Sequence, residues 1–108
     1  MNNTFVIIFR QVRPLTDVEL AGRQHEIAAW ADVANSAGRA LEPRMLGPEF
    51  ARPGGDGLEG DSSAPVSALL FLNAHDLDDA AAVAASHPGV RYGAALEVRP
   101  WNAPAARR

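Results

Sequence analysis

The chain has 108 residues, a formal net charge of −3 and no cysteine. This length is sufficient for one domain that buries its own hydrophobic core. The lack of cysteine excludes disulfides, thiolate metal sites and a cysteine nucleophile, and the acidic balance argues against nucleic acid as a partner, because phosphate binding needs a basic surface.

The start of the chain does not indicate a targeting or membrane segment. Residues 1–4 lack the basic start of a signal peptide, and the apolar run over 5–9 is too short to cross a membrane. We therefore expect a cytoplasmic protein with no membrane partner. A single domain is predicted over residues 1–101, and residues 102–108, which consist mainly of alanine, proline and arginine, are expected to form a disordered tail.

The first half of the chain predicts a strand, a long helix and a second strand. Both alternating sets of side chains over 4–10 are mainly apolar, so this strand should be buried on both faces. Thr16 and Glu19 have the spacing of a capping box, which predicts a helix from Asp17 to Gly38. The apolar stripe of this helix consists of Leu20, Ile27, Trp30, Ala31 and Ala34. Residues 39–46 predict a second strand, and Pro43 either places this strand at an edge of the sheet or makes it bulged.

The second half predicts a loop, a strand, a short helix and a last strand. Residues 47–63 contain five glycines and no apolar period, which is typical of a long mobile loop. The segment 55–60 matches Gly-x-Gly-x-x-Gly, but no strand precedes it and no helix follows it, so we interpret it as a loop and not as a dinucleotide site. Strands are expected over 65–73 and 92–99, with a helix over 76–86 between them.

The order β-α-β-β-α-β predicts an α+β fold of the ferredoxin-like type, a four-stranded antiparallel sheet with two helices on one face. The helices leave the other face of this sheet uncovered, although its first and third strands carry apolar side chains there. A monomer rarely exposes such a patch to water. We therefore expect a homodimer in which two sheets pack face to face.

The candidate site residues gather around the last strand. His87 lies where the second helix ends, and it is either a pocket residue that transfers protons or a cap for free helix carbonyls. Glu97 and Arg99 point to the same side of the strand, so they either pair with each other or bind a polar ligand. The predicted site combines His87 as the catalytic candidate with four ligand-binding candidates: Arg91, Glu97, Arg99 and Trp30.

Other polar groups have simpler explanations. His75 with Asp76, Asp78 and Asp79 includes plausible metal ligands, but acids are expected in the first turn of any helix, where they cap it and match its dipole. We therefore expect neither a metal nor a cofactor. His25 and Asp32 lie off the apolar stripe of the first helix and are expected to face solvent.

Several short motifs, in order, resemble the YCII-related family and its DGPF-like branch. They are Trp30-Ala31-x-x-Ala34-x-x-x-Gly38, Leu46-Gly47-Pro48, Leu77-Asp78-Asp79-Ala80 and the segment from His87-Pro88 to Glu97-Val98-Arg99-Pro100-Trp101. The resemblance spans nearly the whole chain and implies a dimeric α/β barrel with a pocket between the sheet and the first helix. Some members are proposed to use a His–Asp pair in acid–base or dehalogenase-like chemistry. The resemblance puts Ile27 and His87 at the two positions of that pair.

Two functions of different classes follow, and the sequence leaves open whether the protein is an enzyme. The first is a small lyase, isomerase or dehalogenase-like enzyme in which His87 is general acid or base and Arg91 or Arg99 holds an anionic or carbonyl substrate. The second is a non-catalytic dimeric module that binds a small molecule or a partner protein.

Overall fold

The computed structural model describes residues 3–47, 49, 51, 53 and 65–102. The predicted loop over 47–63 lies largely outside these residues, and the Gly-x-Gly-x-x-Gly match lies wholly outside them. The predicted tail over 102–108 is also outside them except for its first residue.

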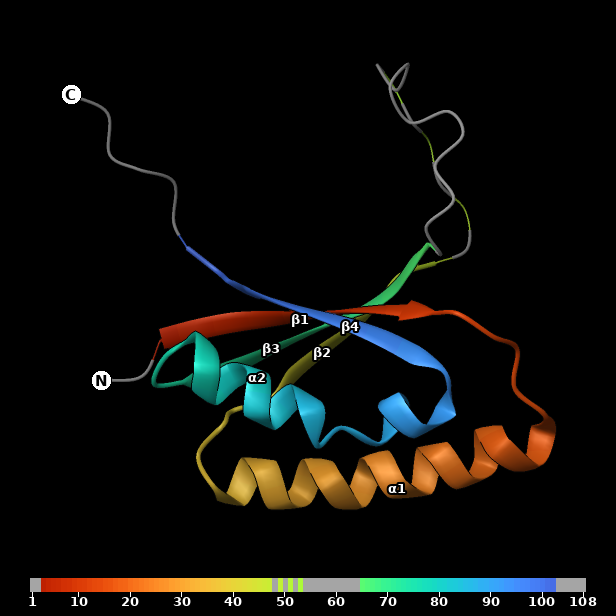
Figure 1. Cartoon of the computed structure of the whole chain (residues 1–108), viewed down its shortest axis with the longest axis horizontal. Helices are drawn as coiled ribbons and strands as arrows, with labels where there is room; N and C mark the ends of the chain where they lie inside the picture. The colour runs from red at the N-terminus through yellow and green to blue at the C-terminus, as the bar shows by residue number, and fades with distance from the viewer. Residues whose placement is uncertain (1–2, 48, 50, 52, 54–64, 103–108) are drawn as a thin grey trace.

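The chain forms a four-stranded antiparallel sheet with the strand order β2-β3-β1-β4 (Figure 1). Helices α1 and α2 lie on the same side of this sheet, which is the predicted ferredoxin-like α+β fold. Pro43 lies in β2, which is an edge strand as expected. The elements in chain order are β1 (Asn3–Gln11), α1 (Asp17–Ser36), β2 (Glu42–Met45), β3 (Val66–Ala74), α2 (Leu77–Ala85), the short 3-10 helix η2 (Pro88–Tyr92) and β4 (Ala94–Pro100).

Helix α1 begins and ends through local signals in its sequence. Thr16 accepts a hydrogen bond from the Glu19 amide, and the Glu19 carboxylate accepts one from the Thr16 amide, so the predicted capping box is confirmed. The last helical residue is Ser36, two residues before the predicted end at Gly38. Gly38 lies just outside the helix with φ at 87°, and the amide of Arg39 donates to the Ala34 carbonyl, which is a Schellman motif.

The prediction that the last strand starts at Tyr92 was wrong. Residues Pro88–Tyr92 instead form η2, and β4 begins at Ala94. Pro88 suits the first turn of a helix because its φ is fixed and its missing amide hydrogen is not needed there. Gly93 then ends η2 in the left-handed conformation, with φ at 82°. A strand cannot readily continue through a residue with this conformation.

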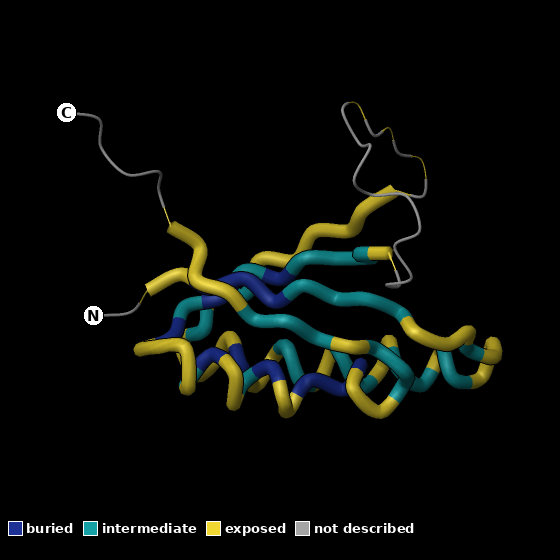
Figure 2. Tube along the Cα trace, turned by 45° about the horizontal axis from the view of Figure 1, so that its top comes forward, coloured by how far each residue is buried: buried dark blue, intermediate teal, exposed yellow. Residues whose placement is uncertain are grey.

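The hydrophobic core lies between the sheet and the helices. The largest fully buried side chains, Ile7 of β1 and Leu72 of β3, belong to the helix-covered face, and Ala80 and Ala84 of α2 pack against them. Figure 2 shows these buried segments on the strands and helices of that layer. No helix in the described part of the chain is both long and apolar enough to span a membrane.

No helix of the described residues lies on the opposite face of the sheet, as predicted (Figure 1). Cross-strand pairing fixes which side chains share this face, because residues directly opposite in an antiparallel pair point the same way. Two rows of side chains cross it from β2 to β4: Glu42, Phe71, Val6 and Arg99 in one row, and Arg44, Leu69, Ile8 and Glu97 in the next.

Candidate functional site

A cavity of about 720 Å³ lies between α1 and the helix-covered face of the sheet. Its walls are mainly apolar, and the larger side chains among them are Phe9, Leu20, Ile27, Trp30, Leu41 and Leu70. Ala34 is the only residue of α1 that is buried, so most of the inner face of this helix borders the cavity instead of packing on the strands. A cavity of this size and composition is typical of a small-molecule site.

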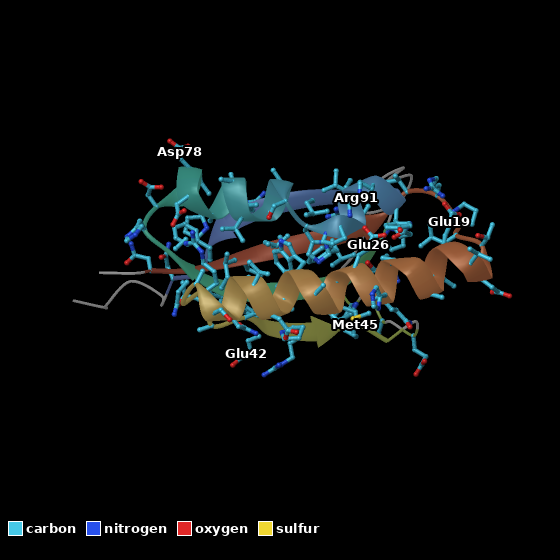
Figure 3. All side chains as sticks on the ribbon, turned by 90° about the horizontal axis from the view of Figure 1, so that it is seen from below. Glu19, Glu26, Glu42, Met45, Asp78 and Arg91 are labelled. Atoms are coloured by element: carbon cyan, nitrogen blue, oxygen red, sulfur yellow. The ribbon has the colours of Figure 1, made fainter. Side chains whose placement is uncertain are left out.

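Contacts with η2 and the segment just before it hold α1 in place beside the cavity. Glu26 of α1 accepts hydrogen bonds from both Arg91 and the Tyr92 hydroxyl, and Figure 3 shows Arg91 and Glu26 side by side between the two elements. Trp30 Nε1 also donates to Ser86 Oγ over 2.9 Å. These bonds join the middle of α1 to the segment before β4.

His87 lies at the wall of the cavity with only 5 % of its surface exposed. Phe9 and Trp30 contact its ring edge to face, with centroids 4.8 and 4.7 Å away. Its Nδ1 accepts a hydrogen bond from the Gly89 amide over 2.9 Å. The ring therefore borders a pocket, as one interpretation expected, but it does not cap the carbonyls at the end of α2 as the other expected: among the described residues it accepts an amide and caps the start of η2.

Burial, and secondly the positive charge of Arg23, lowers the pKa of His87 from 6.5 to about 4. The ring is therefore neutral near pH 7. Because Nδ1 accepts the bond from Gly89, the single ring proton lies on Nε2. His87 thus offers the cavity a hydrogen-bond donor.

Arg23 is the charged residue of this site that the sequence interpretation missed. It lines the cavity, its Nε is buried without a hydrogen-bond partner among the described residues, and its Nη1 donates a long bond of 3.4 Å to Gln11. The signal was present in the sequence, since Arg23 follows Leu20 by three residues and precedes Ile27 by four. This spacing places a charge inside the apolar stripe of α1.

The structure brings together only part of the predicted site. Trp30 and His87 are in contact in the cavity. Arg91 pairs with Glu26 and is not among the residues that line the cavity. Glu97 and Arg99 pair with each other on the uncovered face of the sheet, which the strands separate from the cavity. The predicted ion-pair interpretation of these two residues is therefore confirmed.

The acids near His75 have structural roles. Asp76 caps α2 by accepting a bond from the Asp79 amide. The Asp79 carboxylate receives two bonds from Arg39, of 2.7 and 3.0 Å, and a third from the His75 amide. The guanidinium of Arg39, followed by that amide, lowers the pKa of Asp79 to about 2. Capping, the preferred interpretation of these acids, is confirmed for Asp76.

The remaining predictions on α1 concern His25, Asp32 and Ile27. His25 and Asp32 are exposed, as expected. Ile27 lines the cavity together with His87, so the two positions that the family resemblance assigns to a His–Asp pair border the same space. A scan against protein-family models finds no match to this chain, and a search of the curated proteins finds no relative. Membership in the YCII-related family stays a prediction.

Proposed function

We propose that this protein binds a small organic molecule with a carbonyl or anionic head in the cavity between α1 and the sheet. The observation that carries this proposal is the cavity itself, whose volume of about 720 Å³ falls within the range of small-molecule sites. Its walls are apolar, and a few polar groups, Arg23, Gln11 and His87, border it from three different elements. Such convergence of a few polar groups on an apolar space is what orients a ligand.

The state of His87 favours binding over acid–base catalysis. A general base at neutral pH needs a free nitrogen lone pair, but Nδ1 of His87 already accepts the Gly89 amide and Nε2 carries the proton. A general acid would need an imidazolium, and the lowered pKa makes that form rare near pH 7. His87 is therefore suited to donate a hydrogen bond to a carbonyl or carboxylate oxygen. The alternative, a lyase, isomerase or dehalogenase-like enzyme that uses His87, requires the ring to change tautomer.

The two tryptophans of the chain allow a direct test. Trp30 lines the cavity, whereas Trp101 contacts Phe71 on the uncovered face of the sheet. In a Trp101→Phe variant, small aliphatic acids, amides and ketones should change the fluorescence of Trp30. Adding Ala31→Phe, which fills the cavity, should abolish the response, and a Trp30→Phe variant should show no response at Trp101. A screen in which no compound affects Trp30 would contradict the proposal.

We further propose that two copies pair through their uncovered sheet faces to form a dimeric α/β barrel. Trp101 is 57 % exposed on this face, beside apolar side chains of β1 and β3. The charges at its edges are complementary to a second copy of the same face. A two-fold axis parallel to the strands lays β2 over β4 of the partner subunit, and Glu42 then faces Arg99 while Arg44 faces Glu97.

Charge exchange tests this arrangement without breaking the pairs within each strand. Glu97→Arg with Arg99→Glu keeps the ion pair of β4 but sets like charges against β2 of the partner subunit. The dimer dissociation constant, measured by sedimentation equilibrium, should rise at least about tenfold. Adding Glu42→Arg with Arg44→Glu should return the dissociation constant to that of the unaltered chain. A monomeric unaltered chain, or a β4 exchange without effect, would contradict this pairing of the sheets.

A further inference from the structure

We infer that the cavity ligand is a monocarboxylate with an apolar body, and that Arg23 binds its carboxylate while His87 donates to the same head group. This inference rests on the proposed function, because it names the chemical class of the molecule that the cavity takes. It concerns a residue of α1 that pairs with no acidic side chain in the described part of the chain.

The acids that stand closest to Arg23 along α1 are engaged by other groups. Glu19 precedes Arg23 by four residues and Glu26 follows it by three, which are the spacings of helix ion pairs. Glu19, however, receives bonds of 3.4 and 3.1 Å from Arg13. Glu26 accepts from Arg91 and Tyr92. The charge of Arg23 therefore has no acidic partner from its own helix.

The unused atoms of Arg23 have the geometry that a carboxylate needs. Gln11 takes only Nη1, which leaves the side edge of the guanidinium, formed by Nε and Nη2, without an acceptor among the described residues. Two parallel N–H groups on one edge bind the two oxygens of a carboxylate. A buried N–H donor without an acceptor is unfavourable, so a ligand that supplies one gains binding energy at this position.

The charges of the residues around the cavity favour a ligand with a single negative charge. Arg44 of β2 also borders the cavity, but its side chain belongs to the uncovered face of the sheet and pairs there with Glu42 over 3.3 Å. No acidic residue lines the cavity within the part of the chain that the structure describes. One unpaired guanidinium neutralises a carboxylate but leaves a phosphate dianion with uncompensated charge in an apolar space. The hydrocarbon part of the ligand is then covered by Ile27, Trp30 and Leu41.

Octanoate and octanamide are suitable probes, because they have the same chain length and differ in the charge of the head group. Their dissociation constants are measured by titration calorimetry near pH 7 for the unaltered protein, Arg23→Gln, Arg23→Lys and the control His25→Gln, whose side chain is exposed on α1. The unaltered protein and the control should bind octanoate at least about tenfold more tightly than octanamide. Arg23→Gln should lose this preference and keep its affinity for octanamide, and Arg23→Lys should restore only part of it, because lysine lacks the planar fork.

The outcomes separate this inference from the proposed function. Equal affinities for octanoate and octanamide in the unaltered protein would show that the cavity binds amphipathic molecules without reading their charge, and the inference would be wrong. A preference for octanoate that survives Arg23→Gln would assign the carboxylate to another residue and also overturn it. If neither probe binds and the Trp30 fluorescence screen is negative, both proposals fail together. Inorganic phosphate competing as well as octanoate would contradict the single-charge argument.

Discussion

Acidification from about pH 7 to about pH 5 should destabilise this protein through His87. Its ring is buried between Phe9 and Trp30, and its pKa in the folded chain is about 4, compared with 6.5 when it is exposed. Between these two values the unfolded chain binds a proton that the folded chain does not. The contribution of the neutral His87 ring to folding stability is therefore complete above the pKa of the unfolded chain. It is lost as the pH falls toward the pKa of the folded chain.

The size of the effect follows from the two pKa values. The full difference between 6.5 and about 4 corresponds to about 3 kcal/mol of folding free energy. Most of this lies in an experimentally accessible interval, because the loss between about pH 7 and about pH 5 is about 2 kcal/mol. The carboxyl groups with lowered pKa, Glu19, Glu26 and Asp79, have ordinary values of 4.5 or below, so their own losses begin at lower pH.

Urea denaturation at a series of pH values measures this loss, with His87→Asn as the matched variant. The Asn side-chain oxygen can accept the Gly89 amide as Nδ1 does, so the cap on η2 is kept while the titrating group is removed. His87→Asn should have a lower free energy of unfolding than the unaltered protein at about pH 7. That free energy should then stay nearly constant down to about pH 5. His25→Asn, at an exposed position, should retain the slope of the unaltered protein. Equal slopes in the unaltered protein and His87→Asn would refute the assignment of a buried neutral ring.

Three further predictions concern the fold. Thr16→Ala should lower the free energy of unfolding by about 1 kcal/mol in urea denaturation, because it removes the capping box of α1. Gly93→Ala should lower the melting temperature, since φ is 82° there and a Cβ would lie 2.5 Å from a side-chain atom of Arg13. Asp79→Asn should weaken the contact with Arg39, and its stability deficit, followed by acid denaturation, should shrink as the pH falls from 3.8 toward about 2, because over this interval the unfolded unaltered chain takes up a proton on Asp79 that the folded chain does not.

Local signals in the sequence were enough to predict most of the fold. The capping box at Thr16 and the glycine at 38 mark the two ends of α1 within two residues, and Pro43 identifies β2 as an edge strand. Each of these signals acts on neighbouring backbone atoms. The segment before β4 was predicted less well, because η2 depends on a side chain that accepts a bond from the amide two residues later, and strand propensity alone does not reveal this.

The candidate site was harder to predict because its contacts are distant in sequence. Arg91 was a reasonable ligand-binding candidate until the fold brought it against Glu26, which is 65 residues away in the chain. Arg23 was missed, and its sequence context does not mark it as a free charge, since it has acids at both favourable helical spacings. Only the tertiary structure shows that both acids have other partners.

One cluster of side chains determines both the volume and the charge of the cavity. Tyr92 and secondly Arg91 donate to Glu26 and lower its pKa, so this carboxylate stays ionised at neutral pH and keeps α1 joined to η2. The hydroxyl of Tyr92 also approaches α1 at Gly22, where a Cβ would lie 3.3 Å from it, so a larger residue there would require a small shift of Tyr92. Because Glu26 is occupied in holding the helix, it does not neutralise Arg23 one turn away. The contact that joins α1 to η2 therefore also leaves Arg23 at the cavity without an acidic partner from α1, and a ligand with the opposite charge can supply that partner.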